Sequence, residues 1–197
     1  SLFYAMFIVS FILTDDFPMG KVDKSTLSHQ TLMELFFENV TGNRWMIVGH
    51  GETRKDRIND WFNTDVNSDG EVMTMFWSSC ELSGSLALEW LPNTLQKVFL
   101  CGNSFSGEIN VTCLPDFLEE ITFSDNNLSG CIDLTRLPMS LKRLNLDLNS
   151  FEGEIDFSNL PPSLQFLDME GNMKLSGEIR EFAGKELGIR ETRIKDS

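Results

Sequence analysis

The acidic stretch from Asp65 to Gly70 has the residue types and the spacing of a calcium-binding loop. Its pattern Asp-x-Asn-x-Asp-Gly matches the start of an EF-hand loop, with the glycine at the sixth position. Such a loop needs a bidentate glutamate at its twelfth position, where this chain has Phe76. A glycine turn that leads into a strand explains the same letters, so we expect a turn here and no metal site.

The four cysteines are the next candidates, because thiols can bind zinc or form disulfide bonds. They are Cys80, Cys101, Cys113 and Cys131. They form no C-x-x-C pair and have no neighbouring histidine, which disfavours zinc. Cys80 and Cys101 belong to neighbouring repeats, but their side chains should point to opposite faces. Buried or free thiols are therefore the favoured expectation, and a disulfide bond stays an alternative.

Catalysis has little support from the two histidines. His29 falls in an expected helix and His50 in a polar loop, and no nucleophile with a base at a recognisable spacing accompanies either. We therefore predict no catalytic residue and no cofactor. The formal net charge of −14 argues against a nucleic-acid partner, because a phosphate backbone would be repelled. It favours a basic or neutral partner instead.

One pattern, L-x-x-hydrophobic-x-hydrophobic-x-x-N, organises the chain. Its four copies are LQKVFLCGN from Leu95, LEEITFSDN from Leu118, LKRLNLDLN from Leu141 and LQFLDMEGN from Leu164, and they recur every 23 residues. Alternate side chains of a strand point to opposite faces, so the apolar positions of each copy should face inward. The amide of each closing asparagine should bond buried backbone groups. Stacked copies then form a ladder of Asn103, Asn126, Asn149 and Asn172.

A second phrase follows each asparagine: SFSGEI, NLSGCI, SFEGEI and MKLSGEI. Its apolar residues should fill the core; they are Phe105, Ile109, Leu128, Ile132, Phe151, Ile155, Leu175 and Ile179. The L-S-G-x-I phrase resembles the plant-type class of extracellular leucine-rich repeats, and the LP-x-S-L phrase of the later copies resembles repeats of protist surface proteins. The resemblance implies an α/β-type solenoid: a right-handed coil with parallel strands on its concave face, about five coils and a partial sixth.

Residues 23–71 resemble the N-terminal cap of such proteins. A helix is expected from Asp23 to Val40, with Asp23 or Ser25 as its N-cap. The resemblance implies that this helix, Trp45 and Trp61 cover the open end of the core. The family's usual cysteine pair is absent around Trp61, so a disulfide-stapled cap is not expected. The repeats themselves occupy residues 72–197 and should end on a charged edge strand, which discourages end-to-end stacking.

Residues 1–22 form a separate N-terminal segment, in which Leu2 to Leu13 is nearly all apolar. This run is too short to span a bilayer as it stands. It fits the remnant of a secretory signal or anchor, a segment that packs on the body or on a partner, or a truncated membrane helix. The sequence leaves these three alternatives open, and membrane association is expected only through this segment.

The outward strand positions stack into columns from one repeat to the next. One column reads Phe76, Phe99, Thr122, Asn145 and Asp168, and the next reads Ser78, Cys101, Ser124, Asp147 and Glu170. This face grades from aromatic near the cap to acidic near the C-terminus, as an apolar anchor and a basic segment of a protein partner would require. The predicted partner-binding residues are Phe76, Phe99, Thr122, Asn145, Asp147, Asp168 and Glu170. Alternatively, Phe76 and Phe99 merely cover each other under the N-terminal segment.

A third column, Lys97, Glu120 and Arg143, alternates in sign and is expected to pair across coils. The sequons at Asn39, Asn110 and Asn127 permit glycosylation and a secretory location without establishing either. The sequence therefore predicts a non-enzymatic protein-interaction module, secreted or on the cell surface. The alternative is an accessory or structural subunit of a larger assembly, inside an organelle.

Overall fold

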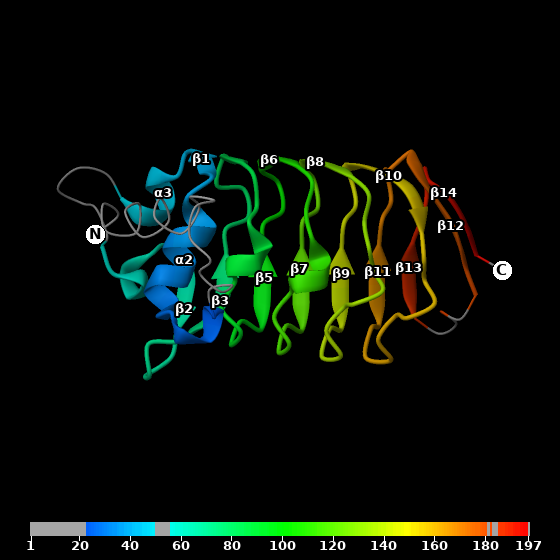
Figure 1. Ribbon diagram of the computed structural model, residues 1–197. Coiled ribbons are helices and arrows are strands. Elements are labelled where there is room, and N and C mark those ends of the chain that lie inside the picture. Colours follow the sequence, from blue (N-terminus) through cyan, green and yellow to red (C-terminus); the bar gives the residue numbers. More distant parts are fainter. Residues whose placement is uncertain (1–22, 50–55, 181, 183–184, 197) are drawn as a thin grey trace, which may run out of the picture.

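The computed structural model describes residues 23–49, 56–180, 182 and 185–196. The expectations for Leu2 to Leu13 and for His50 lie outside these ranges. The described chain is a solenoid, in which coils follow one another side by side from the N-terminal cap to the C-terminal strands (Figure 1). Within the described ranges, no helix is long and apolar enough to cross a bilayer.

The predicted strands form one seven-stranded sheet, which we call the repeat sheet (Figure 1). Its strands are β2 (Thr64–Val66), β3 (Val72–Phe76), β5 (Lys97–Phe99), β7 (Glu120–Thr122), β9 (Arg143–Asn145), β11 (Phe166–Asp168) and β13 (Glu186–Gly188). β2 pairs antiparallel with β3, and each later strand pairs parallel with the one before it. Each coil therefore adds one strand, as the repeat pattern predicts.

A second seven-stranded sheet runs along another side of the solenoid. Its strands are β1 (Val40–Gly42), β4 (Leu82–Gly84), β6 (Ser104–Gly107), β8 (Asn127–Gly130), β10 (Ser150–Ile155), β12 (Lys174–Ile179) and β14 (Arg193–Asp196). Four of these strands, β6, β8, β10 and β12, lie within the second phrase of the repeats. The 3-10 turns η4 (Leu88–Trp90) and η5 (Val111–Cys113) follow β4 and β6.

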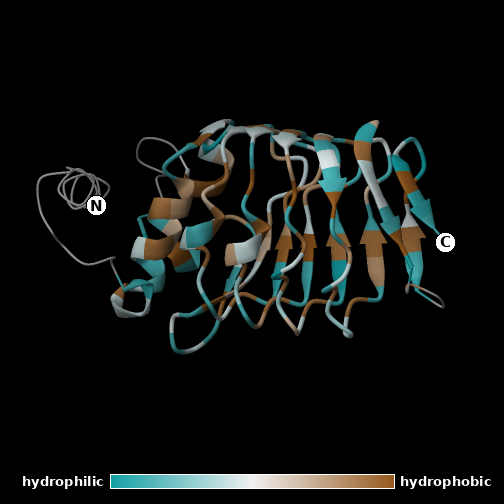
Figure 2. Cartoon of the chain, turned by 45° about the vertical axis from the view of Figure 1, so that its right-hand side comes forward, coloured by the Kyte–Doolittle hydropathy of each residue, from teal (hydrophilic) through white to brown (hydrophobic). Residues whose placement is uncertain are grey.

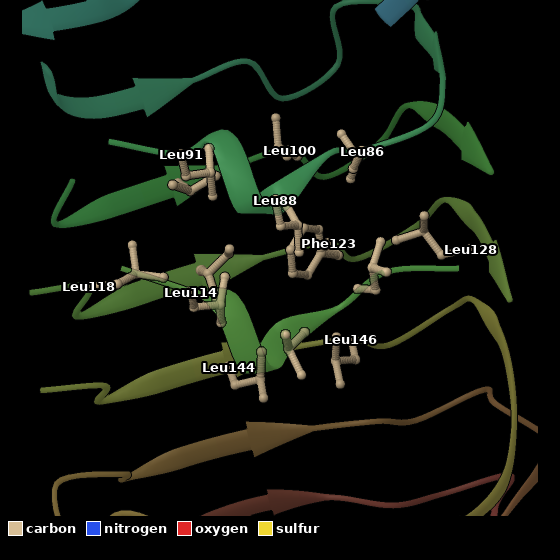
Figure 3. Close-up of a cluster of buried hydrophobic side chains, with 14 of the residues drawn as sticks. Leu86, Leu88, Leu91, Leu100, Leu114, Leu118, Phe123, Leu128, Leu144 and Leu146 are labelled. Atoms are coloured by element: carbon tan, nitrogen blue, oxygen red, sulfur yellow. The ribbon is translucent and has the colours of Figure 1, made fainter. Parts of the chain in front are cut away.

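The core is a continuous column of apolar side chains between the sheets. Leu100, Phe123 and Leu146 occupy the same place in successive coils and are all fully buried (Figure 3). The eight apolar residues predicted from the second phrase are buried as well. Hydrophobic residues recur from strand to strand along the solenoid, which Figure 2 shows in brown. Each coil thus completes its core only against its neighbours.

The asparagines at the strand exits form hydrogen bonds between coils. The Oδ1 of Asn149 accepts from the N–H of Leu128 at 3.0 Å. Its Nδ2 donates to the carbonyl oxygens of Phe123, Leu146 and Asp147 at 2.9, 3.1 and 3.0 Å. Asn103, Asn126 and Asn172 bond the corresponding groups of their coils. One side chain therefore satisfies backbone groups of two successive coils, which are buried from water.

The cap begins with a shorter helix than the one predicted. The helix α2 spans His29–Phe37 and is capped by Ser28, whose hydroxyl accepts from the N–H of Thr31 at 3.1 Å. Asp23 instead caps the 3-10 turn η1 (Lys24–Thr26). Val40 is buried as expected, but it lies in strand β1, which pairs antiparallel with β4. The backbone leaves the helix here because it supplies the first strand of the second sheet.

The aromatic residues that close the core are not all those predicted. Trp61 is buried and lies 5.2 Å from Phe37, between ring centroids. Trp45, in the helix α3 (Trp45–Val48), is 51% exposed, so the expectation that it covers the core is wrong. Trp77 of the first repeat is fully buried and donates its indole N–H to the carbonyl of Phe62 at 3.0 Å. This tryptophan fixes the cap, which also holds the turn η3 (Ile58–Asp60), to the coils.

The buried repeat leucines should carry much of the stability. We expect Leu144→Ala, at a fully buried position, to lower the free energy of unfolding by about 2–5 kcal/mol, because it removes apolar contacts and leaves a cavity. Met139→Ala, at a side chain that is 71% exposed, should change it by less than about 0.5 kcal/mol. Urea denaturation of both variants measures the difference, and equal values would contradict the described burial.

The ladder can be tested with a substitution of similar size. Asn149→Leu should lower the free energy of unfolding by more than about 2 kcal/mol, because several buried backbone groups lose their partner and each costs about 1–3 kcal/mol. Asn127→Ala, at an exposed asparagine of the preceding coil, is the control and should have little effect. Thermal melts that show the same stability for Asn149→Leu and wild type would refute this role.

Candidate functional site

The outward side of the repeat sheet, which we call the repeat face, holds the predicted columns in register. Phe76 is paired with Phe99 and Phe99 with Thr122. Thr122 is paired in turn with Asn145, and Asn145 with Asp168. The strands thus bring residues that are 92 positions apart in the sequence onto one continuous strip.

The aromatic end of the repeat face is a stacked pair. The rings of Phe76 and Phe99 lie 5.0 Å apart between centroids, with an angle of 12° between their planes. Such a pair is worth about 0.5–1.5 kcal/mol beyond the area that it buries. Phe76 nevertheless remains 40% exposed. The two rings therefore cover each other in part and still present apolar surface to solvent. The N-terminal segment, which one alternative places over them, lies outside the described residues.

A depression of about 180 Å³ lies beside this pair. Its lining combines Phe99, Glu120, Ile121, Thr122, Arg143, Asn145 and Phe166. The guanidinium carbon of Arg143 lies 4.0 Å from the centroid of the Phe166 ring, a cation–π arrangement. Sites for drug-sized ligands take about 300–1,000 Å³, so this depression is suited to one side chain of a larger partner.

Sequence reasoning missed Phe166 and assigned Arg143 a purely structural role. The sequence could have placed Phe166 on this face, because the spacing of 23 residues continues the column from Lys97 through Glu120 and Arg143 to Phe166. Lys97 does form the expected ion pair with Glu120, at 3.0 Å. Exposed pairs of this kind are worth about 0–1 kcal/mol, so the pair balances charge more than it stabilises.

The acidic end of the repeat face is partly engaged with its own backbone. Asn145 Oδ1 accepts from the N–H of Asp147, and Asp168 Oδ1 accepts from the N–H of Glu170, both at 3.0 Å. Asp168 also packs over Gly188, whose lack of a side chain leaves it room. Asp147 Oδ1 is shielded from solvent and has no hydrogen-bond partner among the described residues.

The acidic loop of the cap is a turn. Asn67 Oδ1 accepts from the N–H groups of Asp69 and Glu71 at 3.0 and 2.9 Å, and Asn67 Nδ2 donates to Glu71 Oε2 at 2.8 Å. The oxygen that would face a cation is thus occupied by backbone donors. Across the described ranges, no group of three histidine, cysteine or acidic residues is placed to hold a metal ion.

All four cysteines are free thiols. Cys80 is buried, whereas Cys101 lies on the repeat face with its sulfur 2.9 Å from Ser78 Oγ. Burial raises the pKa of the Cys80 and Cys113 thiols, which disfavours the reactive thiolate. The disulfide alternative therefore finds no pair in the structure.

Two larger hollows lie away from the repeat face. One, of about 800 Å³, is lined by Glu154, Asp156, Glu178 and Arg180, of which Arg180 is paired with Glu178 at 2.9 Å. The other, of about 580 Å³, lies in the cap beside His29. The three sequon asparagines, Asn39, Asn110 and Asn127, are exposed and lie outside the strands of the repeat sheet.

The same fold occurs in solved plant ectodomains. The BIR2 ectodomain from Arabidopsis thaliana matches with a TM-score of 0.63 and 17% identity, over 85% of this chain and 94% of that one. A chain of the BIR3–SERK2 complex from Arabidopsis thaliana matches with a TM-score of 0.59 and 20% identity, over 83% and 92%. A chain of the PEPR1–AtPEP1 structure matches with a TM-score of 0.65 and 22% identity, over 84% and 25%.

These likenesses show the fold, which is the solenoid of plant-type leucine-rich repeats. No protein-family model and no curated protein sequence matches the chain.

The cap should respond to pH through His29. Its Nδ1 accepts from the N–H of Val72 at 2.9 Å, and burial lowers its pKa below the usual 6.5, although Glu71 acts in the opposite direction. The unfolded chain therefore binds the proton more readily, and stability is lost as pH falls below about 6.5. We expect the difference in melting temperature between pH 7.5 and pH 5.5 to be smaller for His29→Gln than for wild type.

His50 and the carboxylates are present in both proteins, so their contributions cancel in this comparison. An equal pH dependence for His29→Gln and wild type would show that His29 does not titrate differently in the folded state.

Proposed function

We propose that this chain is a non-enzymatic protein-interaction module that binds a protein partner on its repeat face. The repeat face corresponds to the concave surface of the leucine-rich repeat fold. The single observation that carries the proposal is the grading of this face, from the Phe76–Phe99 stack through the depression to Asp147, Asp168 and Glu170. A rigid sheet presents these groups in fixed register.

The composition of the face supports a protein partner. Aromatic residues and arginine carry most of the binding energy in protein interfaces, and Phe76, Phe99, Phe166 and Arg143 lie together here. The depression accommodates a side chain rather than a whole small ligand. A partner with one apolar anchor and a nearby basic stretch would complement both ends of the face.

The solved neighbours support a binding role of this general kind. BIR3 is described in complex with SERK2, and PEPR1 together with AtPEP1. These descriptions concern those proteins, and only the shared fold extends them to this chain. As part of the same proposal, we place the chain in the secreted or cell-surface class, because the neighbours are ectodomains and the sequon asparagines are exposed.

A non-enzymatic role is supported by what the candidate catalytic groups contact. His29 Nδ1 is occupied by the N–H of Val72, and the acidic cap loop is closed by Asn67. The alternative, an accessory or structural subunit of an assembly, is favoured by the ring stack, because Phe76 and Phe99 bury part of each other. Both roles require contact with protein, but they differ in whether the face is free in the isolated chain.

The role of the aromatic end can be tested with the double variant Phe76→Ser/Phe99→Ser. Wild type and variant are used as baits for crosslinking in the native source, and captured proteins are quantified by mass spectrometry. We expect at least a tenfold loss of the proteins that wild type enriches, because truncated aromatic anchors commonly cost 2 kcal/mol or more. The melting temperature should fall by only a few degrees, because the lost stack is worth about 0.5–1.5 kcal/mol.

Met139→Ser is the matched control, because Met139 is 71% exposed and lies outside the strands of the repeat sheet. It should retain the wild-type set of captured proteins. If the double variant captures the same proteins as wild type, the proposal that this face binds a protein partner is wrong. A constant set of companions that copurifies in fixed ratio and is released by the double variant would favour the subunit alternative.

A further inference from the structure

Every coil has one residue in the left-handed conformation at the point where the repeat strand turns into the ladder. These residues are Ser79, Gly102, Asp125, Leu148, Gly171 and Glu191, with φ angles of 54°, 65°, 53°, 50°, 79° and 54°. The four in the centre of the column each precede a ladder asparagine. The fold therefore requires a left-handed residue here, and glycine meets that requirement without strain.

Leu148 does not suit this position. A bulky side chain with a positive φ is an outlier, because its Cβ crowds the backbone in the left-handed region. Burial does not compensate, because Leu148 is 54% exposed. The chain thus keeps a large apolar residue at a strained and solvent-exposed place, although glycine serves the same turn in the neighbouring coil at Gly171.

The next coil leaves room for the leucine. A Cβ atom placed on Gly171 would lie 3.0 Å from Leu148 Cδ2, so the leucine side chain lies over the backbone of Gly171. Met173, two residues further along, is 69% exposed. Leu148 therefore stands in a defined position at the edge where the repeat strands end.

The charged residues around Leu148 determine which groups of a partner can bind beside it. Asp147 precedes it on the repeat face, and Glu170 occupies the same column in the next coil. Asp125 and Glu191 share its own column and are exposed, whereas Arg190 supplies one positive charge. Asp147 Oδ1 has no hydrogen-bond partner among the described residues. This edge of the face is acidic, and its charge is only partly compensated.

We propose that Leu148 is the apolar anchor of a subsite that extends the repeat face to this edge. Its occupant is a segment of the partner protein that places a large apolar side chain against Leu148 and a lysine or arginine beside Asp147 and Glu170. The proposal rests on the proposed function, since it names the chemistry of the segment that the face binds. Strain at a surface residue is retained where the side chain serves binding rather than folding.

The test uses a displayed library of random twelve-residue peptides, selected on the purified full chain. Enriched peptides are synthesised, and their affinities are measured by fluorescence polarisation. We expect a shared pattern of one large apolar residue next to lysine or arginine, and affinities that weaken as salt rises. Leu148→Gly should weaken binding about tenfold or more, while its melting temperature stays equal or rises by about 2–4 °C because the backbone strain is relieved.

Two further variants separate contact from flexibility. Leu148→Asn keeps a residue that tolerates the left-handed conformation and should weaken binding as Leu148→Gly does. Glu170→Gln should weaken binding and flatten its salt dependence. Met139→Ser is the control for an exposed apolar side chain elsewhere and should bind as wild type.

The proposal is overturned if the library yields no basic and apolar pattern, or if both Leu148 variants bind as wild type. In the second case, loss of binding in Phe76→Ser/Phe99→Ser would leave the proposed function standing and remove only this subsite. Peptides that bind equally to all of these variants would overturn both.

Discussion

The rest of this structure depends on how each coil satisfies its buried backbone at the turn. A solenoid has no separate loop layer at this point, so polar groups of every turn are shielded by the next coil. Asn149 solves this by bonding the N–H of Leu128 and the carbonyl of Phe123, both in the preceding coil, as well as its own turn. The asparagine side chain must also turn into the core, and the residue before each ladder asparagine has a left-handed backbone conformation. This turn recurs in every coil. It therefore sets the register of the repeat strands, which in turn aligns the columns of the repeat face.

The parts of the fold that follow from spacing could be predicted. A period of 23 residues places Val98, Ile121 and Leu144 at one core position, and all three are buried in paired strands. The same period correctly placed Phe99 opposite Thr122. Residues at the ends of the solenoid obey other constraints, because they have a neighbour on one side only. The helix was therefore predicted too long, and Trp45 was assigned to a core that Trp61 and Trp77 close without it.

The register of the columns on the repeat face was predicted correctly, whereas the contacts between their side chains were not, for a physical reason. The repeat length determines which residues belong to the same column, but contacts between columns depend on side-chain conformation. Arg143 could have paired with Glu120 by sequence alone, yet its guanidinium lies over Phe166. Likewise, the sequence does not show that one carboxylate oxygen of Asp168 accepts a hydrogen bond from the N–H of Glu170. Whether a charge is free for a partner is decided by such local bonds.

Two departures from the repeat pattern place large apolar side chains at the surface. In three coils a hydroxyl before the repeat strand, on Thr94, Ser140 or Ser163, donates to a carbonyl of the preceding coil. Phe117 takes that place in the remaining coil and leaves 66% of its side chain exposed. Phe117 thus lacks the hydroxyl that donates to the preceding coil, and Leu148 lacks the freedom of glycine at a left-handed position. The charged groups near them differ. Glu119, near Phe117, is paired with Lys142 at 2.8 Å, whereas Asp147 Oδ1, beside Leu148, has no hydrogen-bond partner among the described residues. These two positions therefore place large apolar side chains at the surface in different electrostatic surroundings.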